Sequence, residues 1–177
     1  MLVGYILLNV GLVLLINGLL LLGQVGQKEI SVANFFAGTM FLLNSLYLAF
    51  SSGGDAASFK AAGLVLLFAF TFLWVAINQY NEADGRGLGW YCGAVGVFLI
   101  PIALTSFQAS ATTWDYWFSL CWALWALLFL MYFALLVLKT NTVKLTGVVA
   151  VINSVVTGWL PAYFLLQGII GPAAAAG

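Results

Sequence analysis

Histidine is missing from this 177-residue sequence, and charged side chains make up only 6% of it. A soluble domain carries about 25% charged residues. A chain that is 64% hydrophobic has too little charge to cover a surface in water. Lipid is therefore its expected solvent, and a net charge of zero leaves no basic face for nucleic acid.

The few charges gather in five narrow places and leave six apolar runs between them. Each run is long enough to cross a bilayer core, which takes about 20 helical residues. The expected spans are 2–23, 31–50, 61–80, 88–107, 115–138 and 145–169. Because the loops are short, the sequence predicts an all-α integral membrane protein with six transmembrane helices in three hairpins. The helical domain is expected over residues 1–170.

The two ends of the sequence need separate interpretation. The first span lacks a positive leading segment and a small-residue cleavage site, so we expect it to be retained and not removed as a signal peptide. The last seven residues, 171–177, form a low-complexity tail. We place this tail outside the helical domain. An artificial origin of the tail would explain its low complexity.

Positive charge predicts the orientation in the membrane. Lys28, Arg86, Lys139 and Lys144 lie in the loops after the first, third and fifth spans, whereas the other side holds only Lys60. Positive residues prefer the cytoplasmic side. We therefore expect a multi-pass inner-membrane protein with both termini on the outer face.

Ionisable residues are absent from the middle of every expected span. Such residues usually mark proton relays and ion-coupled transport, so a proton-driven pump is disfavoured. No base is available to activate a nucleophile, and no cluster of metal ligands exists. We expect no catalytic residue, no metal and no cofactor, with Cys92 and Cys121 as unpaired packing residues.

Neutral amides take the place of charges inside the spans. At 1.5 Å per helical residue, Asn17 and Asn44 lie about 16 Å from the nearest loop charge and Asn153 about 14 Å. Asn78 is shallower, at about 6 Å. These amides either bridge helices or line a path for a polar uncharged solute.

Two prolines fall deep inside spans. Pro101 and Pro161 free the carbonyls of Val97 and Thr157, four residues earlier. At membrane depth a freed carbonyl needs a protein or cavity partner, so each proline marks either an ordinary kink or a polar lining. Thr157 lies on the same helix face as Asn153.

Aromatic side chains form two stripes at helical spacing. Such stripes pack a core or, when rings face rings, form a narrow slot for a flat molecule. The stripes consist of Phe70 and Trp74 followed by Asn78, and of Trp122, Trp125 and Phe129.

Five segments resemble the AmiS/UreI family of urea and short-chain amide channels. They read "NGLLLLGQV", "NFFAGT", "LLFAFTFLWVAINQYNEADGRGLGWYC", "WALWALLF" and "NSVVTGWLPAYFLL", and they extend from the first span to the last. The resemblance implies a six-helix protomer with its own pore, termini outside, and a homo-hexameric ring plugged by lipid. It also implies a pore lined from the first, third and fifth spans. The amides Asn17, Asn78 and Asn153 are added to this lining, as is Thr157, whose carbonyl Pro161 frees. The expected pore-lining residues are thus Val3, Leu7, Val10, Leu14, Asn17, Phe70, Trp74, Asn78, Trp122, Trp125, Phe129, Asn153 and Thr157.

Two departures from the acid-activated urea channel of that family bear on gating. Asn153 stands where that channel has a Glu, and the short loop "SSGGDAASF" replaces one that carries histidine. The expected function is thus a passive channel, not gated by acid, for small neutral amides or urea. The alternatives are an acid-modulated urea channel and a non-conducting membrane scaffold; a coupled transporter is disfavoured.

Overall fold

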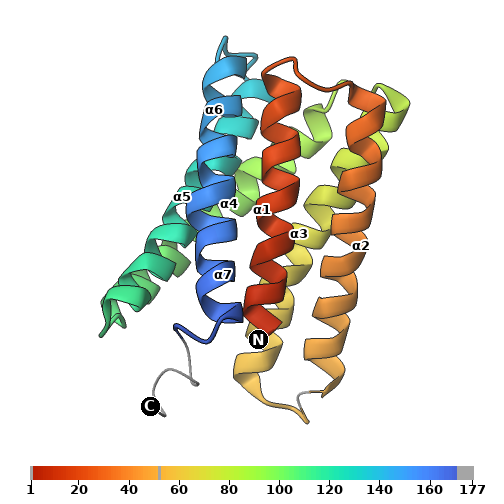
Figure 1. Cartoon of the computed structure of the whole chain (residues 1–177). Helices are drawn as coiled ribbons and strands as arrows, with labels where there is room; N and C mark the ends of the chain where they lie inside the picture. The colour runs from red at the N-terminus through yellow and green to blue at the C-terminus, as the bar shows by residue number, and fades with distance from the viewer. Residues whose placement is uncertain (1, 52, 171–177) are drawn as a thin grey trace.

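Six long helices arranged as a bundle make up the protein in its computed structural model, which describes residues 2–51 and 53–170 (Figure 1). The five uninterrupted helices are α1 Leu2–Leu21, α2 Gln27–Ser51, α3 Ala56–Asn81, α4 Arg86–Gln108 and α5 Thr113–Leu136. The sixth span consists of α6 Val143–Asn153, a π-helical segment η1 Ser154–Trp159, and α7 Leu160–Leu166. All six are long and apolar enough to cross a membrane, which confirms the predicted all-helical, multi-pass fold. The predicted tail, 171–177, lies outside the described residues.

The helix boundaries follow local capping chemistry. The Asp55 carboxylate accepts a hydrogen bond from the Ser58 backbone N–H at 2.8 Å, so α3 begins five residues before the predicted third span. Thr112 and Asp115 form a reciprocal capping box at the start of α5. These caps satisfy N–H groups that the first turn of a helix leaves unpaired.

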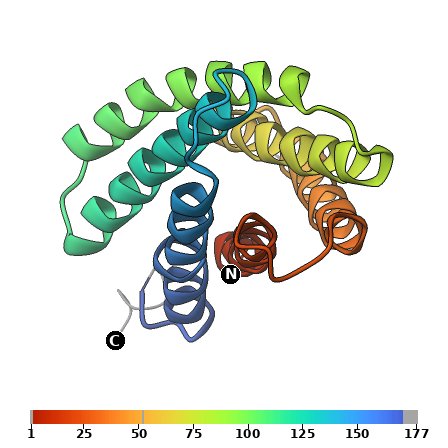
Figure 2. The same cartoon turned by 90° about the horizontal axis from the view of Figure 1, so that it is seen from above.

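The six spans pack as three close pairs, of which two join consecutive helices and the third joins the first span to the last. α2 packs along α3 and α4 packs along α5, whereas α1 packs along the sixth span and thereby joins the two ends of the chain. Figure 2 shows α2 to α5 as an outer arc, with α1 beside α6 and α7 on its open side.

Glycines set the close approach of α1 to the sixth span. Gly4, Gly11 and Gly18 are seven residues apart, and all three face that span. A Cβ at Gly158 would lie 2.4 Å from the Gly11 Cα, and one at Gly11 would lie 2.3 Å from Trp159 Cδ1. Small residues at such positions are how membrane helices gain packing energy without help from water.

The π-helical segment interrupts the sixth span just before Pro161. The Leu160 N–H bonds to the Val155 carbonyl, five residues earlier, instead of four. The proline expected to kink this helix is thus accommodated by one wide turn. Pro101, by contrast, lies inside an unbroken α4.

Candidate functional site

Two cavities lie at opposite ends of the bundle. The larger, about 410 Å³, lies toward the loops that follow α1, α3 and α5, and residues such as Leu21, Gln79 and Leu136 line it. The smaller, about 230 Å³, lies toward the other end, where Leu2 and Ala61 line it. Both cavities therefore lie among α1, α3 and α5, with smaller contributions from the neighbouring helices.

Phe68 and Trp125 line both cavities. Their rings meet edge to face, with centroids 5.2 Å apart and planes at 72°. Phe129 on the side of the larger cavity lies 5.6 Å from Phe68, and Trp122 on the side of the smaller cavity lies 5.0 Å from Trp125. We call these four residues the aromatic junction, because they lie where the linings of the two cavities meet.

Nine of the expected pore-lining residues lie along the two cavities. The smaller cavity is lined by Val3, Leu7, Val10 and Trp122, the larger by Leu14, Asn17, Asn78 and Phe129, and both by Trp125. The five α1 residues among them are spaced by 4, 3, 4 and 3 positions, so they share one helix face that lines both cavities.

Phe70 and Trp74 lie elsewhere, in contrast to the expectation. Phe70 is 53% exposed, and both rings contact Tyr91 of α4, with centroids 5.2 and 5.8 Å from it. α3 instead turns the face of Phe68, Phe72 and Val75 toward the larger cavity. Every face of this helix is apolar or aromatic, so periodicity alone could not identify the inner one.

Asn17 forms a reciprocal amide pair with Asn34 of α2. The Asn17 Nδ2 donates to the Asn34 Oδ1 at 2.9 Å, and the Asn34 Nδ2 donates to the Asn17 Oδ1 at 2.8 Å. Asn34 is fully buried, whereas Asn17 also lines the larger cavity. Asn17 therefore both bridges helices and faces the cavity, and only tertiary packing reveals its partner. Asn44, in comparison, donates to the Met40 carbonyl of its own helix.

Asn153 and Thr157 are buried between α5 and the sixth span. The Asn153 Nδ2 donates to the Leu124 carbonyl at 3.3 Å, and the Thr157 hydroxyl donates to the Asn153 carbonyl at 2.7 Å. Neither residue is among the described lining of the two cavities. This geometry favours helix bridging over direct solute contact for both.

Tryptophan N–H groups of α5 reach the same segment. The Trp125 Nε1 donates to the Thr157 Oγ1 at 2.8 Å, and the Trp117 Nε1 donates to the Val156 carbonyl at 3.0 Å. The Trp125 N–H is therefore bonded within the protein and is not free for a solute.

Polarity differs between the two cavities. The described lining of the smaller cavity is apolar throughout, apart from the indole N–H groups. The larger cavity adds neutral groups, among them Asn17, Thr71, Asn78 and Gln79. Its charged lining residues, Glu82 and Asp84, belong to the loop after α3, at the mouth.

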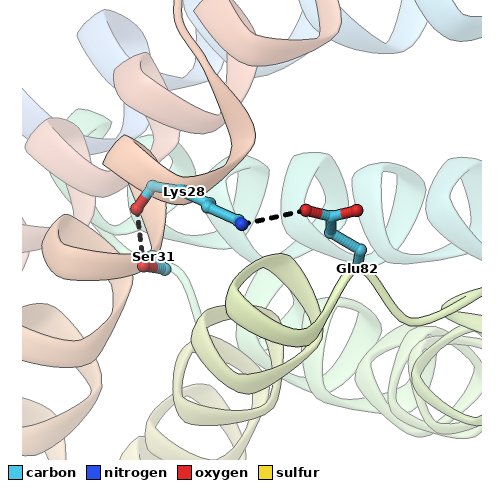
Figure 3. Close-up of polar contacts among 3 residues, drawn as sticks. All are labelled: Lys28, Ser31 and Glu82. Carbon is cyan, nitrogen blue, oxygen red and sulfur yellow. Dashed lines mark hydrogen bonds and ion pairs between the residues drawn. The ribbon is translucent and has the colours of Figure 1, made fainter.

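An exposed ion pair joins α2 to the end of α3 near that mouth. The Lys28 Nζ lies 3.1 Å from a Glu82 carboxylate oxygen, and the Ser31 hydroxyl donates to the Lys28 carbonyl. Figure 3 shows both contacts. Both side chains of the ion pair are more than 60% exposed, so water and salt screen it strongly. It links the start of α2 to the end of α3, at the mouth of the larger cavity.

The chemistry of the site is that of a neutral passage. Among the described residues, no group of three or more His, Cys, Asp or Glu side chains could hold a metal ion. Cys92 and Cys121 are buried and unpaired, as predicted. Amide and hydroxyl groups that line the larger cavity can exchange hydrogen bonds with a small uncharged solute, and the four described residues of the aromatic junction carry no charge to compensate a bare ion.

Comparison with known proteins identifies the family. The family model for AmiS/UreI family transporters matches residues 2–169. The chain is 40% identical to a proposed amidate-substrates transporter of Mycolicibacterium smegmatis, over 93% of this chain and 76% of that one. It is 31% identical to the acid-activated urea channel of Helicobacter pylori, over 92% and 96%. The crystal structure of the urea channel from that organism superposes with a TM-score of 0.84 at 33% identity, over 94% of this chain and 97% of that one. The chain therefore belongs to the AmiS/UreI family of transporters.

Proposed function

We propose that this protein is a passive channel for small neutral amides, with urea as a second solute of the same kind. The observation that carries the proposal is that two cavities, one at each end of the bundle, share Phe68 and Trp125 as lining residues. A solute that passes the aromatic junction would move from one cavity to the other without leaving the protomer. The family relationship supports a solute of this class.

Desolvation explains how a neutral passage selects. Moving an amide into an apolar site without hydrogen bonds costs about 2–7 kcal/mol, whereas an ion costs far more. The amides and hydroxyls of the larger cavity offset part of the smaller penalty. Ions are therefore rejected at the aromatic junction, and large solutes are rejected by its width. Weak binding suits this task, because a tight site would stall conduction.

Acid gating is not part of the proposal. The sequence has no histidine, the side chain whose ordinary pKa lies in the physiological range. Asn153, a neutral residue, is the last residue of α6 and donates to the Leu124 carbonyl of α5. The H. pylori relatives are named for acid activation, and this chain lacks the titrating groups that such activation would use most simply.

Orientation and assembly are also proposals. The larger cavity opens on the side of Lys28, Arg86, Lys139 and Lys144, which the positive-inside tendency places in the cytoplasm of an inner membrane. Both termini then lie outside. We further propose a homo-hexamer surrounded and plugged by lipid, on the family resemblance.

Stopped-flow swelling of proteoliposomes tests the function directly. Purified protein should speed the entry of acetamide, formamide and urea relative to empty liposomes, without saturation at millimolar solute and without effect of an uncoupler. Saturable entry that an uncoupler abolishes would instead indicate a coupled transporter. No acceleration by a fully assembled protein would indicate a scaffold.

A further inference from the structure

We infer that Thr157 is a positioning residue that sets the size limit of the channel, because its hydroxyl holds the Trp125 indole in place across the aromatic junction. The inference rests on the proposed function, since a size limit has meaning only for a conducting protein. It assigns a role in selectivity to a residue that does not itself line either cavity among the described residues.

The hydroxyl of Thr157 has one hydrogen, and the structure shows where that hydrogen goes. Thr157 Oγ1 donates to the Asn153 carbonyl at 2.7 Å, so toward Trp125 it can only accept. The Trp125 Nε1 meets it at 2.8 Å. Both residues are buried, with Thr157 fully inaccessible, so no water competes for either bond.

The π-helical segment presents this hydroxyl to α5. Segment η1 runs from Ser154 to Trp159 and contains both Val156 and Thr157. α5 donates two indole N–H groups to it, from Trp117 to the Val156 carbonyl and from Trp125 to the Thr157 hydroxyl. The wide turn is therefore fastened to α5 on both sides of its centre, and π-turns of this kind are frequent at functional positions.

The other side of the Trp125 ring faces the solute path. The indole lines both cavities and contacts Phe68 and Trp122 edge to face. With its N–H bonded to Thr157, the indole has one favoured orientation. Without that acceptor, the buried N–H is unsatisfied, and the ring gains by turning toward another partner. Such a turn changes the gap between Trp125 and Phe68.

Three threonine variants separate positioning from general packing. Thr157→Val keeps the shape of the side chain and removes the acceptor, whereas Thr157→Ser keeps the acceptor. Thr146→Val is the matched control, because Thr146 is equally inaccessible on the same span and donates to the carbonyl four residues earlier, that of Thr142. Unlike Thr157, it accepts no hydrogen bond from an α5 indole in the described structure.

The first readout is the butyramide-to-acetamide rate ratio in proteoliposomes. We expect Thr157→Val to raise this ratio by about threefold or more. A threefold change corresponds to the net free energy of one ordinary hydrogen bond. Thr157→Ser should keep the wild-type ratio, because the acceptor remains, and Thr146→Val should also leave the ratio unchanged. In a Trp125→Phe background, which has no N–H, Thr157→Val should have no further effect on the ratio.

The second readout is the hydrogen-bond state of the indole, measured by ultraviolet resonance Raman difference spectra between each variant and the wild type. Thr157→Val should lose the signal of one bonded indole N–H, and Thr146→Val should lose none. An unchanged ratio in Thr157→Val, or an equal rise in Thr146→Val, would overturn the positioning role while wild-type flux still supported the channel. A wild-type protein that conducts no amide would instead refute the proposed function. If Thr157→Val fails to assemble, the Trp125→Phe and Thr157→Ser ratios still decide: Trp125→Phe must raise the ratio and Thr157→Ser must not.

Discussion

Phe68 of α3 and Trp125 of α5 meet edge to face with ring centroids 5.2 Å apart, and each belongs to the walls of both cavities. This contact lies where a solute would leave one cavity and enter the other. Their exposed fractions, 8% and 7%, show how little open space remains around them. These two rings are therefore our candidate for the size filter.

Glycine packing between α1 and the sixth span should be intolerant of even one methyl group. Gly158→Ala places a Cβ about where the Gly11 backbone lies, at 2.4 Å from its Cα. Overpacking of this kind costs roughly 1–3 kcal/mol or more. We expect a clear loss of thermal stability in detergent, measured by the temperature at which the assembled protein aggregates.

Gly63→Ala provides the control for that substitution. Gly63 lies in α3 with no heavy atom near its virtual Cβ, and alanine is favoured over glycine within a helix by about 1 kcal/mol. Its thermal stability should be unchanged or slightly higher. Equal losses at Gly158 and Gly63 would contradict the close approach of the two helices.

The amide pair of Asn17 and Asn34 should behave as one coupled unit. Interhelical hydrogen bonds in membranes are worth about 0.6–2 kcal/mol, and a partner left buried and unpaired adds its own cost. Asn17→Leu or Asn34→Leu alone should therefore lower stability, and the double variant should lose less than the sum of the two. Asn44→Leu, whose amide bonds within its own helix, should show no coupling to Asn17→Leu. Strict additivity for Asn17 and Asn34 would argue against the pair.

Permeation should be nearly independent of pH between about 5 and 8, because no histidine is present to change charge there. The Ser58 N–H beside Asp55 lowers the pKa of that carboxyl below its ordinary value of 3.8. A lowered pKa means that the stabilising cap is present above the ordinary value and is lost only as pH falls through the lowered one. Flux at both ends of the range is the measurement. A change beyond about threefold would contradict this expectation, and Glu82→Gln and Asp84→Asn at the mouth would then be the first variants to measure.

Orientation can be tested in the loop between α5 and α6. Asn141 is exposed there, and the native Cys92 and Cys121 are buried, so background labelling should be low. An impermeant thiol reagent should fail to label Asn141→Cys in intact cells and should label it after permeabilisation. Labelling in intact cells would place this loop, and with it the larger cavity, on the outer face.

The sequence was sufficient for the number and class of the membrane spans, and for their ends to within about five residues, because charges and caps occur only near those ends. It did not identify which helices pair most closely, although the seven-residue spacing of Gly4, Gly11 and Gly18 was a usable signal. It also identified the cavity-lining faces of α1 and α5 but not that of α3. In "FAF", Phe68 and Phe70 are the same residue type, so the sequence does not show which of them faces the cavities. In the fold, Phe70 and Trp74 contact Tyr91 of α4 instead.

Hydrogen bonds between segments that are distant in the sequence could not be predicted. Asn17 and Asn34 are separated by 17 residues and Trp125 and Thr157 by 32, so no local spacing connects them. The π-helical turn that exposes Thr157 to α5 arises from Pro161 in a particular packing environment. A proline in a span marks the place of such a distortion without specifying its form.

The most direct test compares matched aromatic substitutions at and away from the aromatic junction. Phe68→Ala and Trp125→Ala should widen the path, and Phe70→Ala and Trp74→Ala should not, since the latter pair lies against Tyr91 outside the described cavity linings. The measurement is the butyramide-to-acetamide rate ratio in proteoliposomes, normalised to assembled protein. We expect a raised ratio for the first pair only. A ratio that rises for Phe70→Ala and Trp74→Ala, or that stays at the wild-type value for Phe68→Ala and Trp125→Ala in assembled protein, would contradict a solute path between these two rings.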